Sequence, residues 1–233
     1  ERGECRYGVL PIENSTAGSV KKVYELMLKH EFHIVRSVRI KIDHNLLAKK
    51  GTKLSQIKEI YSHQQAIEQC SKFIASLPAD VKVTCVENTA KAALMVAMSD
   101  RDDVASISSR FCAEQYALDT IEHSIQDNSN NQTRFICISN ELEIFPGADK
   151  TSLMLITPHK PGSLYKILSR FNSLGINLLK LESRPLPDRN FEFMFYFDLD
   201  VPVYSDKLSL AIDQLVQSLG TNNIKYLGSY REA

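Results

Sequence analysis

Asn131-Gln132-Thr133-Arg134-Phe135 is the stretch on which the interpretation of the whole sequence depends. It joins a polar run at 127–130 to a strand predicted over 134–139, where apolar residues alternate between two faces. Binding groups usually lie on loops held by a rigid element. Arg134 can grip a carboxylate through two parallel hydrogen bonds, and the hydroxyl of Thr133 can assist a leaving group. Taken alone, these residues favour a strand-opening threonine and a solvated arginine, but the rest of the chain reverses that preference.

The composition is that of a globular protein. The chain has 233 residues, of which 43% are hydrophobic and 24% charged, so one large or two modest domains are expected. Lysine and arginine balance aspartate and glutamate at 28 each, which argues against nucleic-acid or membrane-surface binding driven by bulk charge. No apolar run approaches the roughly 20 residues of a membrane span.

Cysteine and histidine usage excludes the common metal motifs. The five cysteines form no CxxC pair, which favours reduced core cysteines in a cytoplasmic protein. The six histidines form no HxH or HExxH pattern, so neither a metal site nor a metal cofactor is expected. The chain begins at Glu1 without a signal-peptide pattern, and we interpret it as a fragment of a longer protein.

Small polar residues follow four predicted strands in the first half. We expect each to cap a helix, with Ser15 or Thr16 as the first cap. Such helix starts at the carboxyl ends of strands form an α/β sheet edge that receives small anionic ligands. No Gly-x-Gly-x-x-Gly or P-loop pattern is present, so a nucleotide is not supported. The four positions are Asn14-Ser15, Ser62, Asn88-Thr89 and Ser108-Ser109.

The second half has a different pattern. Strands and helices over 151–230 follow the order βαββαβ, the ferredoxin-like arrangement, with a helix starting at Pro161-Gly162-Ser163. The strand predicted over 191–200 is apolar on both faces, and we expect its second face to meet another subunit.

Several motifs, in order and spacing, resemble prephenate dehydratase. They are Gly8-Val9-Leu10-Pro11-Ile12-Glu13-Asn14-Ser15, Tyr61-Ser62-His63, Gln69-Cys70-Ser71-Lys72-Phe73 and Asn131-Gln132-Thr133-Arg134-Phe135. Glu182-Ser183-Arg184-Pro185 and Met194-Phe195-Tyr196 resemble the family's carboxy-terminal ACT domain. The family's first strand and Gly-rich turn are absent, as is a fused chorismate mutase domain, so we expect the chain alone to have little activity.

The resemblance implies a fold and its division. A two-lobed catalytic domain like type II periplasmic binding proteins is expected over 1–142, incomplete at its amino terminus, with the second lobe at about 38–118. A linker at 143–150 leads to an α+β ACT domain at 151–233.

The resemblance also implies cofactor-free loss of water and carbon dioxide from prephenate, giving phenylpyruvate in L-phenylalanine biosynthesis. This makes the protein a carbon–oxygen lyase. Thr133 would donate the proton, while Arg134 and helix N-termini would hold the two carboxylates. The residues assigned to catalysis are Thr133, Arg134, Glu13 and Asn14. Those assigned to substrate binding are Ser15, Ser62, His63, Asn88, Thr89, Gln132 and Phe135.

The ACT domain is expected to bind L-phenylalanine as an allosteric effector between subunits of a homodimer or tetramer. Gly162 lies where a strand turns into a helix, so backbone N–H groups can meet the ligand's carboxylate. The residues assigned to this site are Gly162, Ser163, Leu164, Glu182, Ser183, Arg184 and Pro185.

Simpler interpretations stay open at this point. Glu13 can serve as a cap or in a salt bridge between lobes, and His63 can make only a local cap contact. Gly162 can merely shape a helix start, with Arg184 a solvated charge. A non-catalytic module that senses a small acid, with a dimerising ACT domain, fits the capped helix ends equally well. A third possibility is an interaction protein whose ACT sheet only dimerises.

Overall fold

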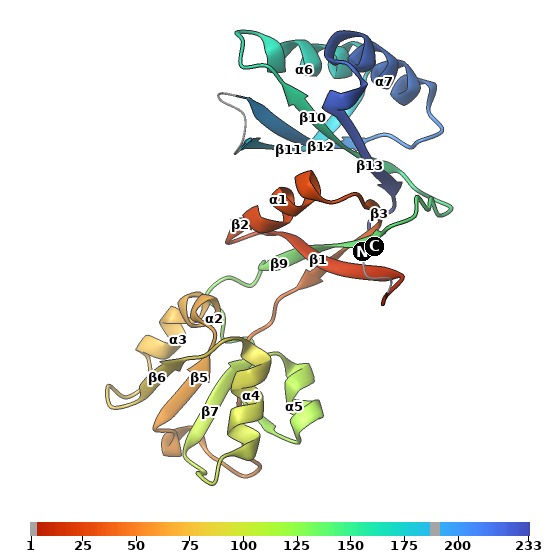
Figure 1. Ribbon diagram of the computed structural model, residues 1–233. Helices are drawn as coiled ribbons and strands as arrows, with labels where there is room; N and C mark the ends of the chain where they lie inside the picture. The colour runs from red at the N-terminus through yellow and green to blue at the C-terminus, as the bar shows by residue number, and fades with distance from the viewer. Residues whose placement is uncertain (1–3, 187–191) are drawn as a thin grey trace. The chain divides into compact units, whose positions relative to one another are not determined.

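The computed structural model describes residues 4–186 and 192–233 (Figure 1). Contacts divide the chain into two compact units. The first unit combines residues 1–40 with 133–233, and the second is the continuous segment 41–132. The predicted second lobe, at about 38–118, falls largely within the second unit. Each buried hydrophobic cluster found among the described residues draws its members from one unit only.

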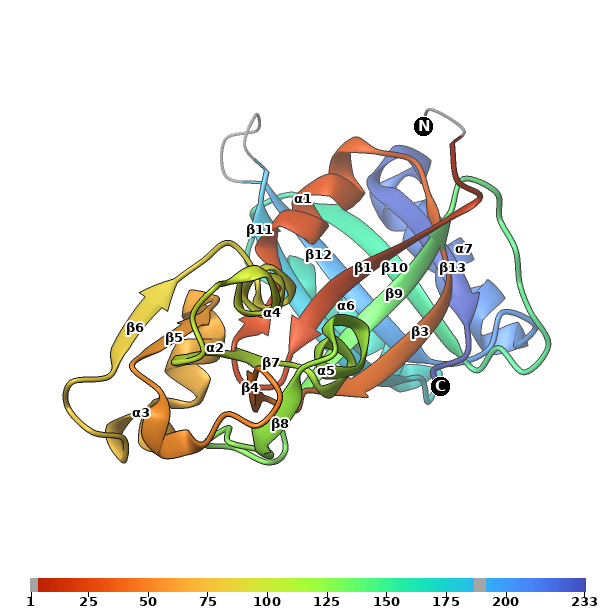
Figure 2. The same cartoon turned by 90° about the horizontal axis from the view of Figure 1, so that it is seen from below.

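The first unit contains a four-stranded sheet of order β2-β1-β9-β3. Figure 2 shows β9 lying between β1 and β3. Alternation of apolar residues explains these strands, because Ile12, Ile34 and Ile136 all lie on the face that becomes the core. The elements are β1 (Tyr7–Asn14), β2 (Gly18–Ser19), α1 (Lys21–Lys29), β3 (His33–Lys41) and β9 (Gln132–Ser139).

The same unit contains a second sheet of order β11-β12-β10-β13. The order of its elements along the chain is βαββαβ, so that prediction is confirmed. Helices α6 and α7 bury their apolar stripes, including Phe171 and Leu215, against one face of this sheet. The elements are β10 (Lys150–Thr157), α6 (Ser163–Ser173), β11 (Asn177–Pro185), β12 (Phe193–Asp200), α7 (Asp206–Leu219), the 3₁₀ turn η2 (Thr221–Asn223) and β13 (Ile224–Tyr230).

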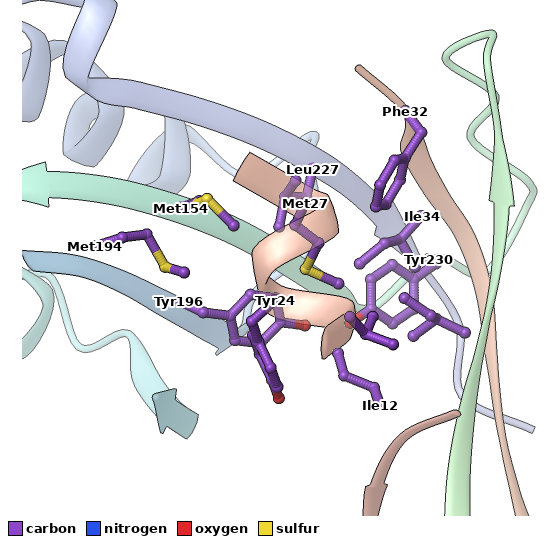
Figure 3. Packing of buried hydrophobic residues seen from close by; sticks show 12 residues of the cluster. Ile12, Tyr24, Met27, Phe32, Ile34, Met154, Met194, Tyr196, Leu227 and Tyr230 are labelled. Atoms are coloured by element: carbon purple, nitrogen blue, oxygen red, sulfur yellow. The ribbon is translucent and has the colours of Figure 1, made fainter. Parts of the chain in front are cut away.

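The opposite face of that sheet shares a core with α1 (Figure 3). The rings of Tyr24 on α1 and Tyr196 on β12 meet edge to face with centroids 5.2 Å apart. Met154 and Met194 are buried beside them. The expectation that this face meets another subunit is therefore wrong, because a helix of the same chain covers it.

The second unit is built on a five-stranded sheet of order β6-β5-β7-β4-β8. β5 runs parallel to β6 and β7, whereas β4 is antiparallel to β7 and β8. The elements are β4 (Asn45–Ala48), η1 (Leu54–Gln56), β5 (Glu59–Ser62), α2 (Gln64–Gln69), α3 (Ser71–Ala75), β6 (Lys82–Cys85), α4 (Thr89–Met98), β7 (Val104–Ser108), α5 (Arg110–Tyr116) and β8 (Asp119–Glu122).

Two of the predicted helix caps are misplaced. After β5 the N-cap of α2 is His63 and not Ser62, because the Ser62 hydroxyl bonds to the carbonyl of Ile107 in the neighbouring strand. Neither Ser15 nor Thr16 caps α1, whose N-cap is Val20. Before α1 begins, the chain turns back after Asn14 and forms β2. This short strand pairs with the end of β1 through Glu13 and Asn14. Asn14 explains the difference, because its side-chain oxygen accepts the N–H groups of Thr16 and Ala17 and so makes a turn instead of a helix.

Candidate active site

Two of the motifs meet as neighbouring strands. β1 and β9 pair antiparallel with Asn14 opposite Thr133 and Glu13 opposite Arg134. The register shifts between Pro11 and Glu13, so β1 carries a bulge there. Residues 119 positions apart in the sequence are thus joined directly, because the Asn14 Nδ2 donates to Thr133 Oγ1 at 2.9 Å.

The orientation of the Asn14 side chain leaves the Thr133 proton available. Its Oδ1 accepts the N–H groups of Thr16 at 3.0 Å and Ala17 at 2.8 Å, which fixes Nδ2 toward Thr133. Since Asn14 is the donor in that bond, the Thr133 hydroxyl keeps its own hydrogen for another acceptor. Thr133 is buried, with 9% of its surface exposed, so its hydroxyl has a defined direction. This arrangement suits a positioned proton donor.

Arg134 points the other way. Successive side chains of a strand face opposite sides, and Arg134 lies on the same face as the core residue Ile136. Its side chain is 4% exposed and pairs with Asp198, Nη1 to Oδ2 at 2.5 Å. The Nη2 donates to Tyr230 Oη at 2.9 Å. Arg134 was predicted to hold a substrate carboxylate, but here its guanidinium is paired inside the first unit, because strand alternation turns it away from the face of Thr133.

The remaining partners of Arg134 complete a buried charge network. The Nε lies 2.8 Å from Glu232 Oε2 and 3.1 Å from Ser37 Oγ. Asp198 Oδ1 accepts from Ser152 and Tyr196, each at 2.5 Å. A buried charge is tolerated only when it is paired and hydrogen-bonded, and this network satisfies both requirements.

The network shifts the pKa values of its members. Burial raises the pKa of Tyr230 and Tyr196, helped by the negative charge of Asp198, so both phenols stay neutral. Burial acts to raise the pKa of Glu232, but bonds from Arg39 and Ser37 and the charge of Arg134 outweigh it and lower that pKa to about 2. Despite its burial, Arg134 has a raised pKa and stays protonated, because the negative charge of Asp198 favours the cation.

Glu13 forms salt bridges within the first unit. It pairs with Lys180 of β11, and its Oε1 lies 3.5 Å from Arg134 Nη1 and 4.0 Å from Arg39 Nη2. Glu13 therefore forms salt bridges, but not between lobes as the simpler alternative had it, because all three partners lie in the first unit. A catalytic role for Glu13 stays a prediction.

In the second unit, polar residues gather at one edge of the sheet. Ser62 ends β5 and Ser108 ends the parallel neighbour β7. Asn88 caps α4, because its Oδ1 accepts the N–H of Lys91 at 2.7 Å, and Thr89 begins that helix. The predicted clustering at the carboxyl ends of parallel strands is therefore present here.

Two residues of this edge make local contacts. Ser62 is fully buried and donates to the carbonyl of Ile107 at 2.8 Å. His63 caps α2, with Nδ1 accepting from the N–H of Gln65 at 3.3 Å. For His63 this is the simpler alternative that the sequence left open. Of the other predicted binding residues, Ser15 and Gln132 are exposed and Phe135 is half-buried.

The predicted effector residues lie on both sides of the second sheet. Gly162, at φ +83°, is the N-cap of α6, and a side chain added there would meet open space. Ser163 and Leu164 begin that helix. On β11, Ser183 pairs with Phe195 on the helix-covered face, whereas Glu182 pairs with Tyr196 on the opposite face.

On that opposite face, Glu182 accepts from Ser19 Oγ at 2.6 Å and pairs with Arg184 at 2.8 Å. Arg184 also lies over the ring of Tyr24, 5.7 Å from its centroid. Pro185 ends the strand and is exposed. Within one chain, Glu182 and Arg184 therefore contact the first sheet and α1 and do not reach Gly162.

Reasoning from sequence missed the partners of Arg134. Asp198 carried a signal, because a carboxylate on an otherwise apolar strand face must find a cation. The sequence held no such signal for Tyr230, Ser37 and Glu232, since nothing local shows that β3 and β13 converge.

In the described part of the chain, no group of three or more His, Cys, Asp or Glu is placed to hold a metal ion. Among the described helices, each is too short or too polar to cross a membrane.

Comparison with known proteins identifies the family of the chain. The family model "Prephenate dehydratase" matches residues 1–143. Arogenate dehydratase 2 of Petunia hybrida is 35% identical over 99% of this chain and 61% of its own length. A bifunctional chorismate mutase/prephenate dehydratase of Neisseria gonorrhoeae is 33% identical over the whole chain and 64% of its own length.

Solved structures agree with these matches. Prephenate dehydratase from Arthrobacter aurescens, in complex with L-Phe, has a TM-score of 0.84 and 31% identity, covering 98% of this chain and 76% of its own. The chain thus spans less than two thirds of the length of the curated relatives above. The matched segment holds both the Glu13-Asn14 and the Thr133-Arg134 motifs, and the chain belongs to the prephenate dehydratase family.

Proposed function

We propose that the protein containing this chain is a prephenate dehydratase that needs no cofactor. The ring carboxylate leaves as carbon dioxide, its bonding electrons complete the aromatic ring, and the ring hydroxyl departs with a proton as water. Hydroxide is a poor leaving group, so this step needs a proton donor. The observation that carries the proposal is the Asn14–Thr133 hydrogen bond. Because Asn14 is the donor, the Thr133 hydroxyl can donate its own proton to the leaving hydroxyl of the substrate.

The other predicted residues take supporting parts in this proposal. Ser62, Asn88 and Thr89 of the second unit stay the residues that we predict to bind a carboxylate. Gln132 precedes the donor on β9, and Phe135 lies on the same face of that strand as Thr133. Arg134 and Glu13 act through the strands that carry Thr133 and Asn14, because their charges are already paired inside the protein.

A turnover assay tests this function. Prephenate and arogenate are each incubated with the complete protein, since relatives of both names match this chain. We expect phenylpyruvate to appear from prephenate, followed by its absorbance. Prephenate binding in calorimetry without turnover would instead favour a small-acid sensor. Absence of both binding and turnover would leave the interaction protein.

We also propose that residues 151–233 form an ACT domain that binds L-phenylalanine in a cytoplasmic homodimer or tetramer. The Arthrobacter relative in complex with L-Phe supports this, as does the open space at Gly162. An effector that binds only the folded state at a hundred times its dissociation constant adds about 2.7 kcal/mol per site to stability.

Thermal melts test the effector site. We expect L-phenylalanine to raise the Tm of the complete protein more than tyrosine does. Gly162→Val should abolish the rise, because the new side chain occupies the open space. Gly220→Val is the control for a β-branched residue placed at positive φ away from the site, since Gly220 also has a φ of +83° and open surroundings, at the end of α7. Equal Tm values with both amino acids and without ligand would refute the site.

A further inference from the structure

The strands that carry Thr133 and Asn14 are tied to the second sheet by two ion pairs. Arg134, next to Thr133 on β9, pairs with Asp198 of β12 at 2.5 Å. Glu13, next to Asn14 on β1, pairs with Lys180 of β11. β11 and β12 are neighbours in the second sheet. Each strand of the proposed donor pair is therefore held at the residue adjacent to the functional one.

The first ion pair, between Arg134 and Asp198, is buried and held by further hydrogen bonds. Arg134 and Asp198 are 4% and 1% exposed, so water cannot substitute for either partner. Tyr230 of β13 bonds to both groups, at 2.9 Å to Arg134 Nη2 and 3.2 Å to Asp198 Oδ1. Ser152 of β10 bonds to the Tyr230 hydroxyl at 2.6 Å. Two strands of the second sheet, β12 and β13, thus bond directly to one guanidinium of the first sheet, and Ser152 of β10 bonds to both of these partners.

We propose that Asp198 and Tyr230 are positioning residues for the reaction, which set the place of the Thr133 hydroxyl by fixing Arg134. Neither contacts the Thr133–Asn14 pair directly, because Arg134 and Thr133 face opposite sides of β9. Their effect passes along the backbone of one strand. The residues predicted to belong to a regulatory half are therefore also part of the catalytic geometry.

Small displacements suffice for such an effect. Misplacing a catalytic group by about 1 Å can cost roughly 10²-fold in rate, even when the altered residue is far from the chemistry. A buried, fully bonded ion pair has one favoured geometry, and deleting one of its bonds lets the strand relax. The expected signature is a loss in kcat with little change in KM, because the binding groups stay in place.

Tyr230→Phe tests the proposal, with Tyr226→Phe as the matched control. Both tyrosines lie on β13, and Tyr226 donates to Ser229 Oγ at 2.7 Å, away from Arg134. The kinetic part rests on the dehydratase function proposed above. In the complete protein we expect Tyr230→Phe to lower kcat about tenfold. Tyr226→Phe should leave kcat near wild type. Loss of the buried Tyr230 hydroxyl also lowers Tm, so kcat is measured well below the Tm of both variants. Equal kcat values for the two variants would overturn the proposal.

A double-variant comparison tests the route through Arg134. Asp198→Asn keeps the shape of the side chain but removes its charge. If Asp198 acts through Arg134, Asp198→Asn should cost far less activity in an Arg134→Gln background than in the wild type. Asp200→Asn, at the exposed end of the same strand, is the control for a general effect of charge on β12. Additive losses would show that Asp198 acts otherwise.

Hydrogen exchange gives a readout that does not need turnover. Tyr230→Phe should speed amide exchange in 131–136 and 13–17, whereas Tyr226→Phe should not. If the wild type turns over neither prephenate nor arogenate, the dehydratase function fails, and exchange alone decides whether the tie positions β9. Unchanged exchange in both segments would overturn the positioning role.

Discussion

At the scale of single residues, the direction of one hydrogen bond decides what Thr133 can do. Asn14 donates to the threonine oxygen because its own oxygen is held by the turn after β1. A hydroxyl that accepts a hydrogen bond can still donate its own proton to a substrate. A hydroxyl that already donates to a neighbouring residue is a poorer proton donor. The geometry therefore favours Thr133 as a donor.

Thr133→Ala should cost far more activity than Thr133→Ser in the complete protein. Serine keeps the hydroxyl that Asn14 orients, and proton donation in a transition state is worth roughly 10²–10⁴-fold. The measurement is kcat with prephenate for both variants, with Tm as the check on folding. Equal turnover by the alanine and serine variants would show that another group supplies the proton.

The sequence predicted part of this site for a clear reason. Asn14 and Thr133 both lie at strand ends beside polar turns, which local patterns reveal. Their pairing, and the burial of Arg134 against Asp198, depend on which strands become neighbours. A period-2 pattern fixes which residues share a face but not which strand that face will meet. The pairing of Arg134 with its partners was therefore beyond prediction, although Asp198 alone carried a signal that it needs a cation.

At the scale of elements, β13 and β3 approach so closely that only glycine fits at one position. Gly228 has φ +141°, and a Cβ there would lie 2.2 Å from the carbonyl oxygen of Ile34. Beyond this point the chain runs alongside β3, where the N–H of Ser37 donates to the carbonyl of Arg231 at 3.2 Å. The two sheets of the first unit are thus joined by main chain as well as by side chains.

Gly228→Ala should destabilise the first unit by roughly 3 kcal/mol, because the backbones must separate to admit a methyl group. Gly162→Ala is the control, since Gly162 has a left-handed backbone (φ +83°, ψ −2°) but nothing within 4 Å. It should cost only about 1 kcal/mol for that backbone. Urea unfolding of both variants measures the difference. Similar losses would mean that backbone conformation alone matters at Gly228.

Elements were easier to predict than their starts. The βαββαβ order and the cap at Asn88 follow from periodicity and from a side chain that can bond only to nearby N–H groups. The start of α1 did not follow, because Asn14 uses its oxygen for a turn and a short strand intervenes. Competing local hydrogen bonds of similar strength cannot be ranked from sequence.

At the scale of the whole molecule, a glutamate with a strongly lowered pKa is found among the described residues of each unit. In the second unit, a bond from Thr84 lowers the pKa of Glu59 to about 2, burial opposes it, and Arg101 and Lys82 add to the lowering. In the first unit Glu232 also reaches about 2. A glutamate in an unfolded chain has a pKa of about 4.3. Both groups therefore stabilise the folded state above that pH and lose this contribution as the pH falls toward 2.

Acid should unfold the protein progressively between about pH 4.5 and pH 2. Glu232→Gln and Glu59→Gln should each lower stability at neutral pH and flatten its dependence on pH over this range. Each substitution should act on the transition of its own unit, because the buried clusters described do not cross between units. Calorimetric melts across the pH range measure this. If the dependence of stability on pH were unchanged in both variants, the two glutamates would not be the cause of acid unfolding.

The placement of residues 41–132 between β3 and β9 has a consequence for how the molecule can be cut and rebuilt. Those two strands are neighbours in one sheet, so the chain leaves the first unit and returns to it through adjacent strands. The second unit is therefore a continuous insertion at a single site of the first unit. A short designed loop in place of 42–131 should give a miniature protein that keeps the cores of both sheets. The excised segment, with its own two buried clusters, becomes a candidate for transplantation into an unrelated scaffold.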